Sequence, residues 1–279
     1  MTMSHGHDAD TDPEQAAREL NTNVAHPARV YDYWLGGKDN FPADRALGDM
    51  MMQAIPTMRE FAAANRAFLG RAVRYLVGEA GIRQFLDIGT GIPTSPNVHE
   101  IAQAAAPETK VVYVDNDPIV LAHARALLTS QDVGETAFIL ADLREPESIL
   151  EHATLTSTLD LTRPVAVLFI GLLMYFRDSD APNPFEMVAT MLEPMPSGSY
   201  LAITHPTPDF NPEETAKAAA AAEAAGITLV PRTKADVERF FNGLELVEPG
   251  VAPMLAWRPD EPVPDPTAAY YWAGIARKP

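Results

Sequence analysis

The hydrophobic residues after position 83 form short, unbroken apolar runs that alternate with segments of helical spacing. Apolar runs of about four to eight residues are typical of strands covered on both faces, as in a parallel sheet flanked by helices. Five such runs predict strands: 84–89, 110–115, 136–142, 164–171 and 199–205. Because helical segments separate them, the sequence predicts an α/β fold on a doubly wound, mostly parallel sheet.

Cap signals predict the helices of this fold. Ser95, Asp117 and Asn211 each precede a proline, which is the pattern of an N-cap followed by proline at the first helical position. The helices that we expect are 95–106, 118–130, 146–154, 184–192, 213–225 and 234–242. Two later apolar runs are consistent with further strands, 244–249 and 268–278, which bring the expected sheet to seven strands.

The first 82 residues follow a different pattern. Residues 1–22 are polar and acidic with no apolar period, and we expect a disordered tail. Residues 23–82 are expected to form a helical extension, in which 59–79 is a strongly amphipathic helix. The stretch 24–48 is dense in Tyr, Trp, Gly and charge but has no clean period, so we expect short helical turns around a loop. Residues 83–279 would form the ligand-binding domain.

Composition narrows the possible functions. Apolar residues make up 47% and charged residues 21%, which is typical of a packed, soluble protein. The net charge of −17 disfavours nucleic acid and anionic membranes as partners, because phosphate groups need a basic surface. The absence of cysteine excludes disulfides and thiolate metal sites. The start of the sequence lacks the features of a secretory signal, and we expect a cytoplasmic protein.

Acidic and glycine residues follow the first three predicted strands. Asp87, Gly89 and Gly91 close the first strand, and paired glycines permit a tight turn with backbone N–H groups facing a ligand. Asp115 ends the second strand, 24 residues after Gly91, where a carboxylate can accept both hydroxyls of a ribose. Asp142 ends the third, where a carboxylate can accept a hydrogen bond from adenine N6. Since the carboxyl ends of parallel strands share one edge, these residues predict a site for an adenosine-containing ligand.

The same residues discriminate between adenosine ligands. The dinucleotide fingerprint needs glycine where this chain has Thr94, which disfavours NAD. The sequence contains no GxxxxGK[ST] motif, which excludes a P-loop nucleotide site. Asp87 would repel a phosphate but suits an α-ammonium group. A ligand with adenine, ribose and a zwitterionic amino acid is S-adenosylmethionine (SAM), which we therefore predict as the cofactor.

The motifs FLDIGTG, VVYVDNDP and FILADL, followed by a late pair of strands, resemble those of class I (Rossmann-like) SAM-dependent methyltransferases. More narrowly, the segments ARVYDYWLGGKDNFPADR and QFLDIGTGIPTSPNVHEIAQ resemble an actinobacterial family of S-adenosyl methyltransferases formerly of unknown function. The resemblance runs from about Val24 to the C-terminus, and VYDYWLGGKDNF is its most specific part. It implies the strand order 3-2-1-4-5-7-6, with the last strand antiparallel.

The resemblance also implies the residues at the methionine end of the cofactor. Gly89, Thr90 and Gly91 would line the methionine moiety, with Asp87 behind them. Gly171, after the fourth strand, would contact the amino-acid part through its backbone.

At the nucleoside end, the resemblance implies that Asp115 holds the ribose and that Asn116 flanks the adenine. Asp142 would meet N6, with Leu143 packed on the ring. Many class I enzymes have a third glycine where this chain has Pro93, so the turn after Gly91 must differ.

The N-terminal block Val24–Gly48 concentrates polar and aromatic groups. We predict that it folds over the cofactor as a lid, with Arg29 or Tyr31 near the methionine carboxylate. In the alternative, Tyr31, Tyr33 and Trp34 anchor an N-terminal helix on the core and have no contact with a ligand.

Methyl transfer from a sulfonium is an in-line displacement, and a base is needed only if the acceptor must lose its proton. His205 after the fifth strand and Tyr175 after the fourth are the candidate bases, although each has a purely structural alternative, and no catalytic residue is assigned. Asp178 and Asp180 could bind Mg²⁺, but a solvated acidic loop explains them better, and no metal is predicted.

Two functions of different classes agree with this pattern. The first is a methyltransferase acting on a small-molecule acceptor. The second is a SAM-binding sensor or accessory protein without transfer activity, which would retain SAM unchanged. An NAD-linked oxidoreductase is a weaker third option, and Thr94 argues against it.

Overall fold

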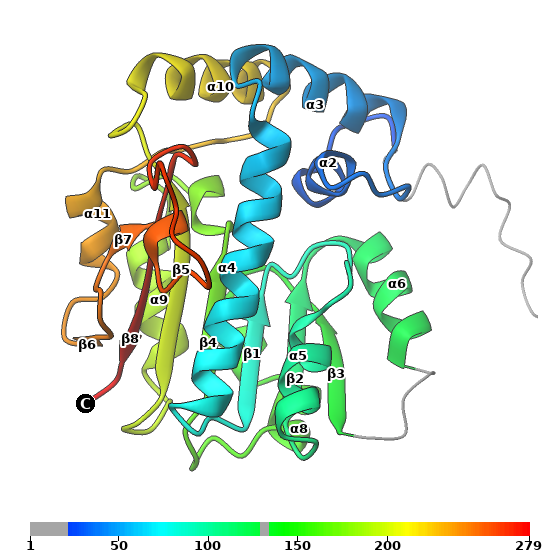
Figure 1. Ribbon diagram of the computed structural model, residues 1–279. Helices are drawn as coiled ribbons and strands as arrows, with labels where there is room; N and C mark the ends of the chain where they lie inside the picture. The colour runs from blue at the N-terminus through cyan, green and yellow to red at the C-terminus, as the bar shows by residue number, and fades with distance from the viewer. Residues whose placement is uncertain (1–21, 129–133) are drawn as a thin grey trace, which may run out of the picture.

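A mixed sheet of eight strands forms the centre of the computed structural model, which describes residues 22–128 and 134–279 (Figure 1). The strands are β1 (Gln84–Ile88), β2 (Lys110–Asp115), β3 (Glu135–Leu140), β4 (Ala166–Ile170), β5 (Tyr200–Pro206), β6 (Glu245–Leu246), β7 (Ala252–Pro253) and β8 (Tyr271–Arg277). The predicted tail, residues 1–22, lies outside the described residues except for its last position.

The strand order confirms the predicted α/β topology. It is β3-β2-β1-β4-β5-β8-β6, with β1 to β5 parallel and β8 antiparallel to β5. This is the order that the resemblance implies, with β8 as the last strand in sequence. The eighth strand is the two-residue β7, which pairs with β8 and was not predicted.

Helices cover both faces of the sheet, and a group of them gathers at one of its ends (Figure 1). The helices are α2 (Pro27–Trp34), α3 (Pro42–Ala54), α4 (Met58–Gly78), α5 (Val98–Ala105), α6 (Pro118–Leu128), α7 (Pro146–Leu150), α8 (Ala153–Thr158), η1 (Leu173–Tyr175), α9 (Pro184–Leu192), α10 (Pro212–Ala224), α11 (Lys234–Arg239) and η2 (Met254–Ala256).

The strands bury alternate residues in two separate cores. In β1, Phe85 packs with the residues of α4 and α5, whereas Leu86 and Ile88 pack with those of α9 and α11. A strand that is apolar on both faces therefore reads as a continuous apolar run, which is why the sequence located β1 to β5 well.

The helix after β1 begins later than predicted. Asn97, and not Ser95, is its N-cap, because Asn97 and Glu100 form a capping box in which the Glu100 carboxylate accepts a hydrogen bond from the Asn97 backbone N–H. The predicted helix 146–154 is also wrong in detail, since the chain forms two short helices there, α7 and α8.

The N-terminal stretch is more regular than predicted, since the expected short helical turns around a loop are two regular helices, α2 and α3. These helices lack a clean apolar stripe because they bury charged residues, namely Arg29, Asp32 and Asp44. With α10, which packs on α3, they lie beyond the carboxyl ends of the parallel strands (Figure 1). Among the described helices, none is long and apolar enough to cross a bilayer.

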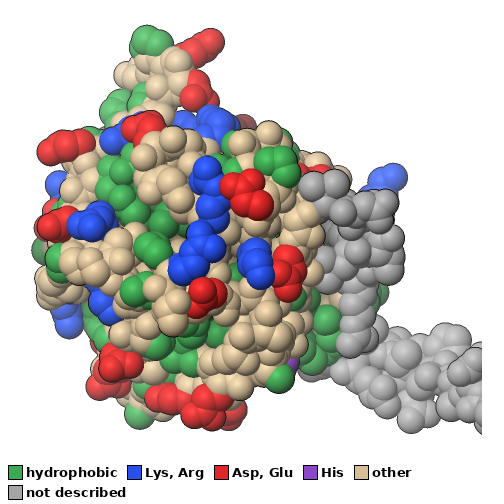
Figure 2. Space-filling view, turned by 90° about the horizontal axis from the view of Figure 1, so that it is seen from below, with side chains coloured by type: hydrophobic (Ala, Val, Ile, Leu, Met, Phe, Trp, Pro, Cys, Tyr) green, Lys and Arg blue, Asp and Glu red, His purple; other side chains and the backbone are tan. Residues whose placement is uncertain are grey.

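The opposite end of the sheet carries paired charges. Lys110 and Glu135 pair at the starts of β2 and β3, and Arg277 pairs with Glu245 where β8 and β6 meet. Seen from this side, acidic and basic side chains are intermixed over the surface (Figure 2). Mixed charges of this kind suit a solvated surface.

Candidate functional site

A cavity of about 450 Å³ lies at the carboxyl ends of β1, β2, β3 and β4. Residues from α2 and α4 form part of its wall, and Gly226–Thr228, which follow α10, complete it. Ten of the eleven predicted cofactor residues line this cavity: Tyr31, Asp87, Gly89, Thr90, Gly91, Asp115, Asn116, Asp142, Leu143 and Gly171. The topology thus brings together side chains that lie more than a hundred residues apart in the sequence.

The turn after β1 depends on its glycines. Gly89 and Gly91 have φ of 70° and 66°, a left-handed conformation that disfavours residues with a side chain. A Cβ on Gly89 would lie 2.5 Å from Leu172 Cδ1, whereas a Cβ on Gly91 would meet only the Ala28 Cβ, at 3.9 Å. Gly89 therefore lets the β1 turn pass closely beneath the segment after β4.

Asp115 joins this turn to the next strand. One carboxylate oxygen, Oδ2, accepts a hydrogen bond of 2.8 Å from the Gly91 N–H, and the other accepts one of 3.0 Å from the Asp117 N–H. Asp115 is only 7% exposed, and burial raises the pKa of its carboxyl group. These two hydrogen bonds orient the carboxylate, which lines the cavity. Each oxygen keeps a further lone pair, so the carboxylate can still accept hydrogen bonds from hydroxyl groups.

Asp142 is held at the far side of the cavity. Its Oδ2 accepts hydrogen bonds of 3.0 Å from the Asn116 amide and from the Arg144 guanidinium. Its Oδ1 accepts one of 2.9 Å from the Arg144 backbone N–H. The three side chains form one polar edge, beside the apolar surface of Leu143.

Asp87 and Arg66 place opposite charges at the other end of the cavity. Burial raises the pKa of Asp87 to about 7, although the positive charge of Arg66 opposes that rise. Arg66 Nη2 donates hydrogen bonds to the carbonyls of Thr94 and Pro96, and so fixes the loop that carries Pro93 instead of a third glycine. A buried carboxyl group with such a pKa favours a cationic ligand beside it.

Tyr31 belongs to a buried chain of polar groups beneath the cavity. Its hydroxyl donates a hydrogen bond of 2.9 Å to the Ala62 carbonyl and accepts one of 3.1 Å from the Asn65 amide. Asn65 Oδ1 in turn accepts a hydrogen bond of 2.7 Å from the Thr204 hydroxyl. Burial raises the pKa of Tyr31 to about 12. The chain connects α2, α4 and β5 and fixes α2 against the cavity.

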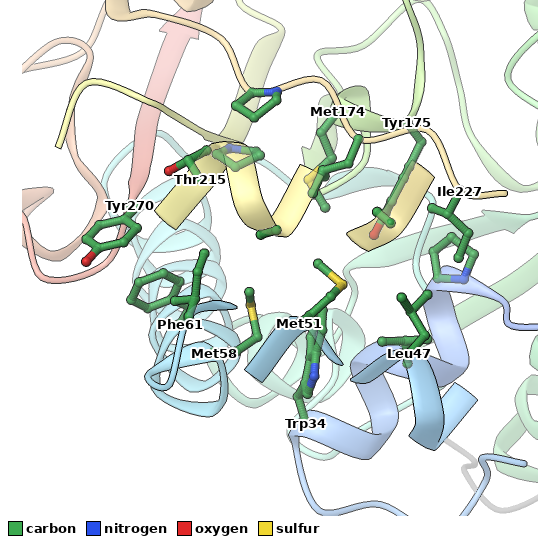
Figure 3. Close-up of a pocket in the computed structure, with 18 of the residues that line it drawn as sticks. Trp34, Leu47, Met51, Met58, Phe61, Met174, Tyr175, Thr215, Ile227 and Tyr270 are labelled. Carbon is green, nitrogen blue, oxygen red and sulfur yellow. The ribbon is translucent and has the colours of Figure 1, made fainter. Parts of the chain in front are cut away.

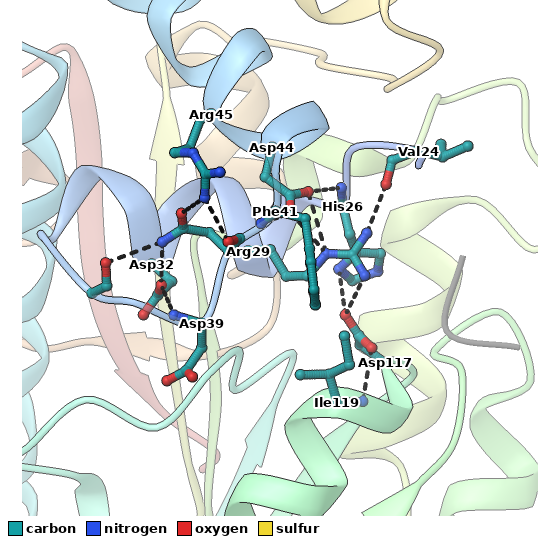
Figure 4. A network of polar contacts seen from close by, with 12 residues as sticks. Val24, His26, Arg29, Asp32, Asp39, Phe41, Asp44, Arg45, Asp117 and Ile119 are labelled. Atoms are coloured by element: carbon teal, nitrogen blue, oxygen red, sulfur yellow. Dashed lines mark hydrogen bonds and ion pairs between the residues drawn. The ribbon is translucent and has the colours of Figure 1, made fainter. Parts of the chain in front are cut away.

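Arg29, the eleventh predicted residue, does not line the cavity. It is 2% exposed, and its Nε lies 3.2 Å from Asp44 while its Nη2 donates a hydrogen bond of 2.7 Å to the Val24 carbonyl (Figure 4). Its Nη1 lies 3.9 Å from Asp117 Oδ2. His26 Nδ1 is 3.1 Å from the same oxygen, within ion-pair range although not in hydrogen-bond orientation. These contacts connect α2 and α3 to the start of α6.

The two candidate bases differ in position. His205 is fully buried outside the cavity lining. Its Nε2 lies 2.8 Å from the Arg232 guanidinium, which can only donate, and its Nδ1 lies 2.9 Å from the Pro206 carbonyl. Burial and the charge of Arg232 lower the pKa of His205 to about 3. The Nε2 lone pair is thus already engaged, which supports the structural alternative for His205.

Tyr175, by contrast, lines the cavity, and burial raises the pKa of its phenol. The nearby acidic residues are occupied by other contacts: Asp178 pairs with Arg232, and Asp180 accepts a hydrogen bond from the Arg177 backbone N–H. Within residues 22–128 and 134–279, no group of three or more His, Cys, Asp or Glu side chains is arranged to hold a metal.

Among the polar lining residues that were not predicted from the sequence are His26, Asn65 and Arg66. One signal for Asn65 was present. On α4 the apolar stripe runs through Phe61, Phe68 and Ala72. Asn65 lies within this stripe and is buried like its apolar neighbours. A polar residue at a buried helical position must have a polar partner, and here those partners are Tyr31 and Thr204.

The chain is similar to S-adenosyl methyltransferases over most of its length. The family model of S-adenosyl methyltransferases matches residues 13–279. A DUF574 family protein from Streptomyces avermitilis is 48% identical over 93% of this chain and 100% of its own, with a TM-score of 0.89. A candidate methyltransferase from Thermobifida fusca is 43% identical over 93% of this chain and 97% of its own, with a TM-score of 0.87. No curated protein matches the sequence. The chain therefore belongs to the S-adenosyl methyltransferase family and is a SAM-dependent methyltransferase.

Proposed function

We propose that this methyltransferase acts on a small-molecule acceptor inside the roofed cavity. The observation that carries the proposal is the concave shape of the site, because α2 and the segment after α10 line a cavity of about 450 Å³ beyond the strand ends. A concave pocket of a few hundred Å³ suits small ligands better than a macromolecular substrate. The net charge of −17 further argues against nucleic acid as the acceptor.

The residues present fit SAM from one end of the cavity to the other. Asp87 would pair with the α-ammonium group and Arg66 with the carboxylate, which replaces the predicted role of Arg29. Asp115 would accept the ribose hydroxyls. Asp142 and Leu143 would hold the adenine, with Asn116 beside it. The glycine turn at Gly89–Gly91 would lie against the methionine part, and Gly171 opposite it.

SAM supplies an already activated methyl group, so the protein needs chiefly to align the acceptor and exclude water. Proximity of this kind can contribute up to about 7–11 kcal/mol of the barrier. His205 is unsuited to take a proton, because Arg232 already occupies its free lone pair. An acceptor that loses its proton to water after transfer would need no protein base.

We further propose that residues 23–82 form the lid and extension of a SAM-binding domain, residues 83–279, with Arg66 reaching the site from the extension. Two observations support this division. The N-cap His26 and the α2 residues Ala28 and Tyr31 line the cavity. Arg29 of α2 pairs with Asp44 and so fixes α2 to α3. In this proposal α2 covers part of the cavity as a lid and is also anchored on the core. It therefore combines the two alternatives that the sequence left open, a lid and an anchoring helix.

The test is release of S-adenosylhomocysteine from purified enzyme, SAM and a metabolite extract separated by size. We expect release only with the fraction below about 1 kDa, the size range of ligands for such cavities. Release with protein or RNA alone would contradict a small-molecule acceptor. Tight SAM binding with no release in any fraction would favour the sensor function instead.

A further inference from the structure

A second, smaller hollow adjoins the cofactor cavity. Its volume is about 50 Å³, and it lies among α2, α3, α4 and α10 (Figure 3). Three residues, Pro27, Tyr175 and Ile227, line both spaces. We call this hollow the apolar chamber; its walls include Trp34, Leu47, Met51, Met58, Phe61 and Met174.

The chamber wall carries no charge. Among the described residues that line it there is no Asp, Glu, Lys, Arg or His. Apart from the Tyr175 hydroxyl, its polar side-chain atoms already have partners: for example, Trp34 Nε1 donates to the Gly48 carbonyl, and the Thr215 hydroxyl donates to the Thr207 carbonyl. A charged group placed there would lose its hydration without compensation, at a cost of several kcal/mol. The chamber therefore selects against charged molecules.

Side chains of the chamber wall can also move to make room for a ligand. A volume of about 50 Å³ is below the roughly 150 Å³ of an apolar cavity that binds benzene, so a ring must displace side chains. Met51, Met58 and Met174 project into the space (Figure 3), and unbranched methionine side chains repack at little cost. On the α10 side, Ala218 and Ala222 form the wall.

Tyr175 stands where the two spaces meet. It belongs to η1, which Arg232 holds by donating hydrogen bonds to the carbonyls of Leu173 and Phe176, at 3.1 and 2.9 Å. Its hydroxyl has no hydrogen-bond partner within residues 22–128 and 134–279 and points into the chamber (Figure 3). Since burial raises the pKa of this phenol, it remains a hydrogen-bond donor at neutral pH.

We propose that the apolar chamber receives the nonpolar body of the methyl acceptor and that the Tyr175 hydroxyl binds the acceptor's polar atom at the opening to the cofactor cavity. The acceptor is therefore an uncharged, largely apolar small molecule with a hydroxyl or similar group. This inference rests on the proposed function, and it assigns the substrate class and a residue that contacts the substrate.

The test uses three ring compounds as probes and the full-length protein saturated with S-adenosylhomocysteine. The probes are 4-methylphenol, 4-hydroxybenzoate, which replaces the methyl by a carboxylate, and toluene, which lacks the hydroxyl. We expect 4-methylphenol to bind at least tenfold more tightly than 4-hydroxybenzoate, as measured by calorimetry or ligand-detected NMR.

Two variants locate the binding. Ala218→Leu fills the chamber, and we expect it to weaken 4-methylphenol at least tenfold while S-adenosylhomocysteine binds as in the wild type. Ala220→Leu, on the exposed side of the same helix, is the matched control and should change neither. Tyr175→Phe should weaken 4-methylphenol about fivefold and leave toluene unchanged, and this comparison decides the matter should Ala218→Leu fail to fold.

The proposal is overturned if 4-methylphenol does not bind, if 4-hydroxybenzoate binds equally well, or if Ala218→Leu and Ala220→Leu behave alike. The chamber would then be a packing defect only. Failure of the proposed function is a separate result, since it would appear as wild-type protein that releases S-adenosylhomocysteine with macromolecules and not with small metabolites.

Discussion

Asp115 lies at the carboxyl end of β2 and His205 at the carboxyl end of β5, and only Asp115 lines the cavity. Asp115 receives two backbone N–H groups and still faces the cavity, whereas His205 is fully buried and bonded to Arg232 and Pro206. Both lie at the carboxyl ends of buried strands, and both were site candidates from the sequence. The difference lies in their neighbours, because β2 has parallel strands on both sides and β5 has the antiparallel β8 on one. A position at a strand end therefore does not by itself place a residue in the site.

The largest effect should come from the β2 end. Asp115→Ala removes the predicted ribose acceptor, and two hydrogen bonds to a charged group contribute about 3 kcal/mol together. We expect SAM to bind at least about a hundredfold more weakly in calorimetry. Asp160→Ala, which removes an exposed carboxylate at the other end of the sheet, is the control. Unchanged affinity in Asp115→Ala would remove the basis for the whole assignment of the site.

The next effect concerns the turn after β1. Gly89→Ala forces a side chain into the left-handed region and against Leu172, and should cost about 2 kcal/mol of unfolding free energy. Gly91→Ala has a similar backbone conformation, but its Cβ would make only an ordinary contact with the Ala28 Cβ, and the change should cost about 1 kcal/mol. Denaturant unfolding measures both. Measured against Leu172→Ala alone, Gly89→Ala should cost no more than Gly91→Ala costs in the wild type. Equal costs for the two single variants would contradict the steric argument.

Asp87 adds a pH dependence to the β1 end. Its pKa of about 7 in the folded protein exceeds the ordinary 3.8, so the folded state favours the protonated form. Stability without cofactor should therefore fall as the pH rises between about 4 and 7. Affinity should change in the opposite sense, because the ionised carboxylate pairs with the ammonium group: SAM should bind roughly tenfold more tightly at pH 8 than at pH 6. Asp87→Asn should bind weakly with a flat profile, and a steep profile in that variant would exclude Asp87 as the cause.

A smaller effect on SAM affinity should come from α2, which lies over the turn after β1. Ala28 of α2 lies above Gly91, and Ala28→Leu would fill the space where the methionine part is proposed. We expect SAM affinity to fall about fivefold, which corresponds to about 1 kcal/mol. Val24→Leu, at an exposed position just before α2, should leave the affinity unchanged. Equal affinities for the two variants would show that α2 is an anchor only.

The smallest effect should come from the β5 end. His205→Gln keeps a hydrogen-bond acceptor for Arg232, and release of S-adenosylhomocysteine in an active extract fraction should change less than about twofold. Loss of a general base would instead reduce the rate by about 10²–10⁴. A rate loss of that size with normal SAM binding would reverse our assignment of His205 as a structural residue.

The sequence by itself determined the sheet and the acidic and glycine residues at the carboxyl ends of its first three strands. Unbroken apolar runs located the five parallel strands, because burial on both faces requires apolar residues at successive positions. The turn at Gly89–Gly91 and the acidic residues Asp115 and Asp142 follow directly from those strands, so their convergence at one edge could be predicted from topology alone.

Tertiary structure decided what covers that edge. Arg29 and Asp44 are buried by pairing with each other, so a binary apolar pattern could not reveal α2 and α3 as ordered helices. Arg66 reaches the cavity, and Arg29 does not, because of where α4 and α2 pack on the sheet. The same packing buries His205 against Arg232 and leaves Tyr175 at the opening of the apolar chamber. Such outcomes depend on contacts between residues far apart in the chain, and local periodicity carries no information about them.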